Sequence, residues 1–214
     1  RDYNSGEAYL RKSLELRKKL LGENHKDVAE CYYDLGMLFF RKFSYDSAEF
    51  YLKASLDLRI KVWGLNHEEC LRSSIQLGTL YLNRGRSDSA EVYYIQSLEI
   101  ARKIRGENHA DYGSCLNNLG IVYQRRSELK KSIAVLQQAE SIFKNTVGEE
   151  SVLYMNCLEN LGNAYLDMLD FNTSEDYFKR LLVLRKKVLG ESDPGYISVM
   201  GNLGLLYSTM GDHK

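Results

Sequence analysis

Three histidines are the side chains in this sequence best suited to metal binding or acid–base chemistry. They recur at an interval of 42 residues, and an acidic residue follows each of them two positions later. Imidazole nitrogens bind Zn²⁺ and exchange protons near neutral pH. Packed helices lie ~8–10 Å apart, so equivalent residues two helices on are roughly 16–20 Å apart, too far for one ion. We predict no metal site and interpret the histidines as caps at helix starts: His25, His67 and His109.

The cysteines are the second group that could do chemistry, but their spacing fits neither a metal site nor a catalytic pair. Four of them are spread along the chain without any CxxC pair. Three share one position of the repeat, where the other repeats have serine or valine, which indicates a small packing site. Unpaired cysteines favour a reducing compartment, so we expect a cytoplasmic protein. The four residues are Cys31, Cys70, Cys115 and Cys157.

No catalytic motif accompanies these residues. The sequence has no glycine-rich phosphate loop, no Gly-x-Ser-x-Gly elbow and no His-Glu-x-x-His segment. We therefore predict a protein that is not an enzyme, with no catalytic residue and no cofactor. The 29 basic residues equal the 29 acidic ones, which argues against a broad nucleic-acid or anionic-membrane surface. No apolar run approaches the ~18 residues of a membrane span.

The histidines belong to a repeat that covers the whole chain. A Leu-Gly pair recurs five times at steps of 42 residues, beginning with Leu35-Gly36, and an aromatic residue stands three positions after each glycine. A second glycine, beginning with Gly22, keeps the same period. Such self-similarity is typical of a solenoid of stacked structural units. Four tyrosines share another position, which we interpret as a contact between helices: Tyr9, Tyr51, Tyr93 and Tyr177.

Each repeat predicts two helices. Residues 68–84 carry one helical stripe of apolar and small residues, and a longer stripe follows a four-residue turn at Gly85. The longer helix ends in basic residues before a glycine, and Asp193-Pro194 has the form of a helix start. We predict an all-α, right-handed superhelical solenoid of stacked antiparallel helix hairpins, with five repeats forming one domain over residues 1–214. We also expect this domain to be a piece of a longer array.

The pattern resembles the tetratricopeptide repeat. The resemblance rests on the Leu-Gly pair, the aromatic residue three later, and a small residue twelve after the glycine, such as Ala48 and Ala90. The usual unit has 34 residues; this longer form, with its Gly-Glu-Asn-His turns, is similar to the repeats of kinesin light chains. It is equally similar to bacterial tetratricopeptide proteins, some of which end in a caspase-like (CHAT) peptidase domain.

The resemblance implies a groove lined by the shorter helix of each repeat. The groove would be lined by the residue just before each Leu-Gly pair and by the residues four before, three after and seven after that residue. These four positions share one helix face. Asparagines at the preceding position bind peptide main chain in related repeats. The groove residues that we predict to bind a peptide are Asp34, Arg72, Gln76, Asn83, Asn118, Arg125, Asn156, Asn160, Asn163, Asp167 and Asn202.

The function expected from this groove is a scaffold that binds a peptide or protein segment. The amides of Asn118, Asn160 and Asn202 would contact its backbone, while Arg72, Arg125 and Asp167 would select its sequence. Three alternatives stay open. The asparagines could simply solvate an exposed face, the groove could capture a partner helix, or the array could be the sensing arm of a larger enzyme such as a caspase-like peptidase. Self-association through uncapped repeat ends is a further possibility.

Overall fold

The computed structural model describes residues 2–212, with Asp212 described by its backbone alone, and within them it contains only α-helices. The even-numbered helices α2, α4, α6 and α8 have 16 residues each, and the odd-numbered helices have 18 or 19. Their bounds are α1 (Tyr3–Leu21), α2 (Lys26–Arg41), α3 (Tyr45–Trp63), α4 (Glu68–Asn83), α5 (Ser87–Arg105), α6 (Ala110–Arg125), α7 (Leu129–Thr146), α8 (Val152–Asp167), α9 (Phe171–Leu189) and α10 (Pro194–Asp212).

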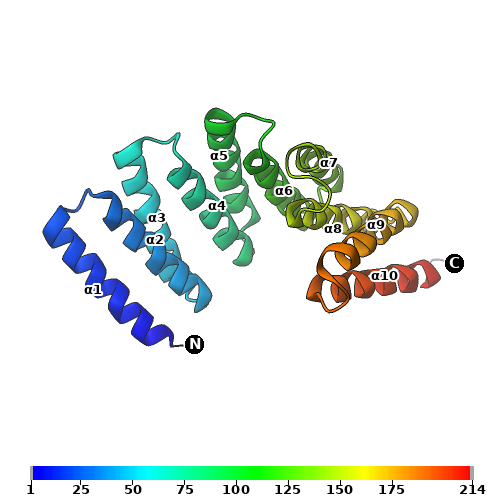
Figure 1. Cartoon of the computed structure of the whole chain (residues 1–214), viewed down its shortest axis with the longest axis horizontal. Helices are drawn as coiled ribbons and strands as arrows, with labels where there is room; N and C mark the ends of the chain where they lie inside the picture. The colour runs from blue at the N-terminus through cyan, green and yellow to red at the C-terminus, as the bar shows by residue number, and fades with distance from the viewer. Residues whose placement is uncertain (1, 213–214) are drawn as a thin grey trace. The chain divides into compact units, whose positions relative to one another are not determined.

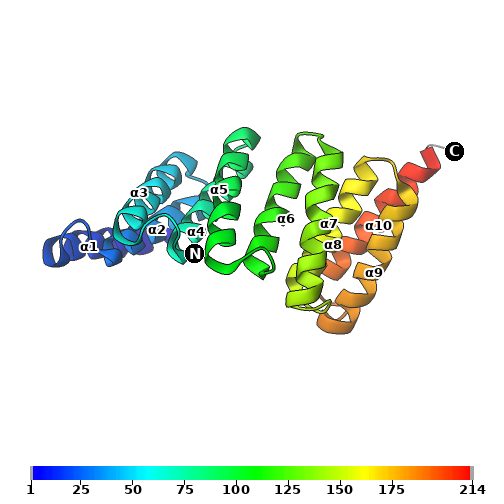
Figure 2. The ribbon, with the colours of Figure 1, turned by 90° about the horizontal axis from the view of Figure 1, so that it is seen from above.

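The chain divides into two compact units, residues 1–106 with α1–α5 and residues 107–214 with α6–α10. In each unit every helix packs against the next one along the chain, as Figure 1 shows for the first unit and Figure 2 for the second. In the second unit α8 also contacts both α6 and α10. The predicted all-α fold of stacked helix hairpins is confirmed. The single domain over residues 1–214 stays a prediction.

The turns between helices follow the capping pattern expected from the sequence. The Nδ1 atom of His25 accepts a hydrogen bond from the backbone N–H of Asp27 at 3.2 Å, and His67 and His109 make the equivalent bond. A side-chain oxygen caps the later even-numbered helices, from Ser151 on α8 and from Asp193 on α10. The interpretation of the histidines as helix caps is therefore confirmed.

The glycine of four of the five Leu-Gly pairs lets an odd-numbered helix approach an even-numbered one closely. A Cβ atom added to Gly36 would lie 2.7 Å from the Leu52 side chain, and one added to Gly120 would lie 2.5 Å from Leu136. Gly78 and Gly162 face Tyr94 and Phe178 in the same way. Carbon atoms pack at ≈ 3.5–4.0 Å. Any larger residue at these glycines would push the two helices of a hairpin apart.

Aromatic stacking forms a second contact in three of the hairpins. The ring planes are nearly parallel, with centroids 5.5 Å apart for Phe39 and Tyr51. The pairs Tyr81–Tyr93 and Tyr165–Tyr177 stack similarly, at 5.4 and 5.6 Å. Three of the four tyrosines predicted to contact a neighbouring helix therefore do so. The prediction is wrong for Tyr9, whose side chain is 76% exposed on α1.

The four cysteines are buried packing residues, as the shared repeat position predicted for Cys31, Cys115 and Cys157. Cys70, Cys115 and Cys157 are fully buried, and Cys31 is nearly so. Burial raises the pKa of the Cys115 thiol to about 12. The Cys115 thiol is therefore protonated at neutral pH, and the four side chains contribute contacts to the core.

The close approach at glycine gives a direct test of the packing. Gly120→Ala should destabilise the second unit by about 1–3 kcal/mol, because Leu136 and its neighbours have to move to make room for a methyl group. Gly201→Ala is a matched control within α10, where an added Cβ meets nothing within 4 Å. It should stabilise the unit by roughly 0.5–1 kcal/mol through helix propensity. Urea unfolding followed by circular dichroism measures both, and equal midpoint shifts would contradict the packing described.

Candidate functional site

The predicted groove residues lie on the even-numbered helices, on a face separate from the one that packs at glycine. At its centre is the residue before each Leu-Gly pair, and we call these five positions the ladder. None of the five side chains is fully buried, whereas Leu35, Leu77, Leu119 and Leu161 next to them are inaccessible or nearly so. The ladder residues are Asp34 and Gln76 in the first unit and Asn118, Asn160 and Asn202 in the second.

In the second unit the ladder occupies the three even-numbered helices α6, α8 and α10, of which α8 contacts both of the others. Asn118 and Asn202 make no side-chain hydrogen bond with the described residues. The Nδ2 of Asn160 donates to the Oδ1 of Asn117 at 2.9 Å, which ties α8 to α6 and orients the Asn160 amide. Sequence reasoning missed Asn117, because the other repeats carry four different residue types at its position and give no periodic signal.

Two other predicted groove residues of the second unit, Asp167 and Asn156, already make side-chain hydrogen bonds within the protein. The Asp167 carboxylate accepts a hydrogen bond from Gln124 at 2.7 Å. The Asn156 side-chain oxygen accepts one from Arg185 at 3.2 Å. Arg125 is exposed at the end of α6, and the half-buried Asn163 makes no side-chain hydrogen bond with the described residues. Asp167 would therefore have to exchange Gln124 for a ligand in order to select a sequence.

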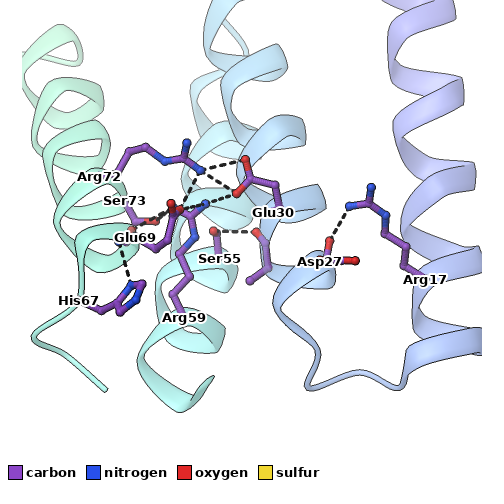
Figure 3. Close-up of polar contacts among 10 residues, drawn as sticks. Arg17, Asp27, Glu30, Ser55, Arg59, His67, Glu69, Arg72 and Ser73 are labelled. Carbon is purple, nitrogen blue, oxygen red and sulfur yellow. Dashed lines mark hydrogen bonds and ion pairs between the residues drawn. The ribbon is translucent and has the colours of Figure 1, made fainter. Parts of the chain in front are cut away.

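In the first unit, an ion cluster holds Arg72, which the sequence suggested as a selector of ligand sequence (Figure 3). The guanidinium of Arg72 pairs with Glu30 of α2 at 2.7 Å and with Glu69 of its own helix at 2.8 Å. Both carboxylates also pair with Arg59 of α3, a fully buried side chain. Arg59 donates further to the backbone oxygen of Glu69 at 3.0 Å and to Ser73 at 2.8 Å.

The ring of Tyr33 completes this cluster. The guanidinium carbons of Arg59 and Arg72 lie 4.6 and 4.4 Å from its centroid. Burial lowers the pKa of Arg59. Burial acts in the same direction on Arg72, but the Glu30 and Glu69 carboxylates outweigh it and raise the pKa of that group. Both arginines stay charged, and together they join α2, α3 and α4.

An arginine at the same repeat position makes related contacts in two other places. Arg17 of α1 donates to the backbone oxygen of Asp27 at 3.0 Å (Figure 3). Arg185 of α9 pairs with Asp193 at 3.2 Å and with Glu159 at 3.0 Å. The sequence showed these arginines in or before basic runs that we attributed to helix ends alone. Each of these arginines ties an odd-numbered helix to the start of the next even-numbered helix. The recurrence of arginine at one repeat position is the feature of the sequence that could have indicated this role.

A hollow of about 400 Å³ opens beside the ladder position of α2. Three predicted groove-lining residues, Asp34, Met37 and Arg41, lie on one wall, and α1 contributes Tyr3 and Leu10. Asp34 makes no hydrogen bond or ion pair with the described residues. Burial raises the pKa of its carboxyl, and the neighbouring Glu30 carboxylate adds to the shift.

The remaining groove residues of the first unit lie on α4. Gln76 is half-buried and makes no side-chain hydrogen bond with the described residues. Asn83 is exposed at the end of the helix, where its Nδ2 donates to the backbone oxygen of Thr79 at 2.8 Å. Asn83 therefore caps the end of its own helix, and its Nδ2 is already engaged there.

In the part of the chain that the structure describes, no group of three or more histidine, cysteine, aspartate or glutamate side chains is arranged to hold a metal ion. No helix among the described residues combines the length and hydropathy needed to cross a membrane.

The arrangement of the helices indicates the class of protein. Hairpins of antiparallel helices, stacked in chain order and repeated every 42 residues, are those of a helical-repeat protein of the solenoid class. The sequence model of the tetratricopeptide repeat matches residues 1–61, 69–145 and 154–214. The chain belongs to the tetratricopeptide repeat family. Members of this family are commonly protein-interaction scaffolds and are generally not enzymes.

Solved structures support the fold. BtubC (BKLC) from P. vanneervenii is 21% identical, with 99% of this chain and 85% of that chain covered and a TM-score of 0.83. A kinesin light chain protein with nearly identical TPR-like repeats from Podosopora anserina is 16% identical, covering 86% and 87%, with a TM-score of 0.75. The apo form of RapI is 15% identical, covering 100% and 78%, with a TM-score of 0.74. No match was found among curated protein sequences.

Replacing the buried Arg59 tests whether this residue contributes more to the stability of the fold than an exposed charge on the same helix. Arg59→Ala should cost roughly 3 kcal/mol, because it leaves a cavity and removes a fully buried partner from two carboxylates. Lys61→Ala is the control in the same helix, since Lys61 is exposed and makes one side-chain hydrogen bond, to Asn24. It should change the stability by no more than about 0.5 kcal/mol. Chemical unfolding measures both variants, and similar losses would contradict a structural role for Arg59.

The unpaired carboxylate beside the hollow predicts a pH-dependent stability difference. The raised pKa of Asp34 means that the folded state holds its proton more tightly than the unfolded state does. Stability is therefore lost as the pH rises through that raised pKa. Asp34→Asn cannot ionise, so it should unfold at a higher temperature than the parent at neutral pH and at nearly the same temperature near about pH 3. A variant that is less stable at neutral pH would contradict this account.

Proposed function

We propose that this chain is a scaffold whose second unit binds the main chain of an extended peptide or protein segment. The observation that supports it most is the ladder of amides on α6, α8 and α10. Asn118 and Asn202 make no side-chain hydrogen bond with the described residues, and Asn160 is oriented by Asn117. A side-chain amide has both donors and an acceptor, so it complements a peptide group whatever the side chain beside it.

The spacing of the ladder suits an extended segment. The contacts of α8 with α6 and α10 correct the expectation that residues two helices on are roughly 16–20 Å apart, because helices in contact lie about 10 Å apart. An extended chain advances ~3.3 Å per residue. A segment that crosses α6, α8 and α10 would thus present about every third peptide group to the next amide. Asn160 retains a free oxygen when its Nδ2 is bonded to Asn117, so it is suited to accept from a ligand N–H.

Selectivity would come from the residues three positions after each ladder amide. Ile121 and Leu205 occupy this position on α6 and α10, and Asn163 occupies it on α8. Leu205 is 59% exposed and Ile121 is half-buried. The segment would therefore carry apolar side chains toward α6 and α10 and a polar one toward α8. Since Arg72 is held by Glu30 and Glu69, we assign it no part in selection.

The cellular setting is part of the proposal. The four buried cysteine thiols support a reducing compartment, and we propose a cytoplasmic location for that reason. The alternative, in which the array is the sensing arm of a larger enzyme, stays a prediction.

Peptide selection tests the proposal. A displayed library of random peptides is selected on the chain, and the recovered peptides are measured by fluorescence polarisation. Asn118→Ala combined with Asn202→Ala should weaken their binding at least tenfold, about 1.4 kcal/mol. Thermal stability should hardly change, because neither amide is bonded within the described residues.

Asn145→Ala provides the matched control. Asn145 is an exposed asparagine near the end of α7, off the ladder, so this variant should keep full affinity. Equal affinities for the ladder and control variants would contradict the proposal. A library that yields no binder would contradict it as well.

A further inference from the structure

In the first unit, an ion pair joins the residue that caps the end of an even-numbered helix to the preceding odd-numbered helix. Lys42 at the end of α2 pairs with Glu7 of α1 at 2.9 Å. Arg84 at the end of α4 pairs with Glu49 and Asp46 of α3, at 2.7 Å in each case. The cation thus meets a carboxylate in the first two turns of the odd-numbered helix and bridges the two helices.

The helices α7 and α8 of the second unit carry other residues at all three of these positions. Met168 caps the end of α8 in place of the cation. On α7, Ile133 takes the position of the two glutamates, and Lys130 takes that of the aspartate. Ile133 is buried, so an apolar core residue replaces one carboxylate and a cation replaces the other. These residues cannot form the ion pair that bridges the helices of the first unit.

A hollow of about 470 Å³ opens between the changed residues. Its apolar wall comes from Leu129 at the start of α7 and from Met168, whose side chain is 39% exposed. Methionine is flexible and polarizable, so it can adapt to apolar groups of different shapes. The hollow lies within the second unit and contains no ladder residue, and its lining consists of Ser127, Glu128, Leu129, Lys130, Lys131 and Met168.

Lys130 is a cation of this hollow that has no partner. It is exposed and makes no hydrogen bond or ion pair with the described residues. Lys131, in contrast, pairs with Glu128 at 2.5 Å, and its Nζ lies 5.7 Å from the centre of the Tyr123 ring. Glu128 also pairs with Arg126 at 2.7 Å. Because two other cations already share the Glu128 carboxylate, an acidic group from outside the chain would be the first partner of Lys130.

We propose that this hollow binds a segment of a partner protein that carries an aliphatic side chain next to an aspartate or glutamate. The aliphatic side chain packs against Leu129 and Met168, and the carboxylate pairs with Lys130. The partner thereby supplies the acidic half of a bridge that α7 and α8 do not make for themselves. This site differs from the ladder, so it does not depend on the proposed binding of peptide main chain there.

The acidic residues around the hollow favour a single carboxylate over an anionic membrane surface. Asp167 is exposed beside Met168, and Asp170 caps the start of α9 two residues further on. An extended anionic surface would meet these carboxylates and Glu128 together with Lys130, and like charges repel. One acidic side chain beside an aliphatic one can approach Lys130 from the hollow alone.

Two changes should close the hollow without disturbing the fold. Lys130→Asp combined with Met168→Arg places the charges of Asp46 and Arg84 at their equivalent positions, so the variant can form the bridge of the first unit. Its melting temperature, followed by circular dichroism, should not fall. Lys12→Asp combined with Val183→Arg is the matched control, because it makes the same charge changes at two exposed positions away from the hollow.

Peptide binding to these variants tests the site. Random displayed peptides are selected on the parent chain, and the recovered peptides are measured by fluorescence polarisation. Peptides with an acidic residue next to an aliphatic one should bind K130D/M168R more weakly than the parent by about tenfold or more. They should bind K12D/V183R and the ladder variant N118A/N202A as tightly as the parent. Lys130→Glu alone, which leaves the apolar wall in place, should weaken the same peptides.

Several results would overturn the proposal. One is a set of recovered peptides that K130D/M168R and Lys130→Glu bind as tightly as the parent does. Another is that the weakened peptides carry no acidic residue, or that K12D/V183R weakens them equally. Vesicles made of equal parts of phosphatidylcholine and phosphatidylserine provide the last test. If the parent sediments with these vesicles and K130D/M168R does not, the hollow contacts a membrane and the assignment to a protein segment is wrong.

Discussion

The close contact between a bare glycine and a bulky side chain is the constraint on which the rest of this structure depends. Gly120 receives Leu136 and Gly162 receives Phe178, so each pair of helices packs more closely than a side chain at these positions would permit. The contact fixes which face of an even-numbered helix meets its partner. Because a helix face spans only a few residue positions, fixing one face also determines which residues are left on the others.

The ladder follows from that division of faces. In the segment Asn118-Leu119-Gly120, the leucine and the glycine pack inward, while the asparagine remains half-buried and available. The same division of faces is found on α8, where Leu161 and Gly162 are buried and Asn160 is half-buried. The α8 helix contacts both α6 and α10, and α10 carries the third amide, Asn202. The packing requirement therefore creates a polar surface of regular spacing. Members of the tetratricopeptide repeat family commonly act as interaction scaffolds, and this surface is the one that we propose for that use.

Charged groups in the same repeats stabilise the stack instead of remaining available to a ligand. Arg59 is fully buried and pairs with Glu30 and Glu69, so the desolvation of its charge is compensated by two carboxylates and two further acceptors. Arg72 shares these carboxylates and is held by them. Burial and ion pairing thus divide the arginines of the first unit: Arg72 is held in place, while Arg41 lines the hollow beside Asp34.

The helices, their caps and the packing positions can be predicted from the sequence alone, because they depend on local periodicity and on residue size. Gly22 and His25 mark a turn, and Leu35-Gly36 marks a packing face, without knowledge of any distant partner. Which polar side chains are free depends instead on the tertiary structure. Asn160 bonds Asn117 from the preceding even-numbered helix, and Arg72 meets a glutamate 42 residues earlier. Such pairings depend on how long, flexible side chains of separate helices meet in space, which no single-helix pattern specifies.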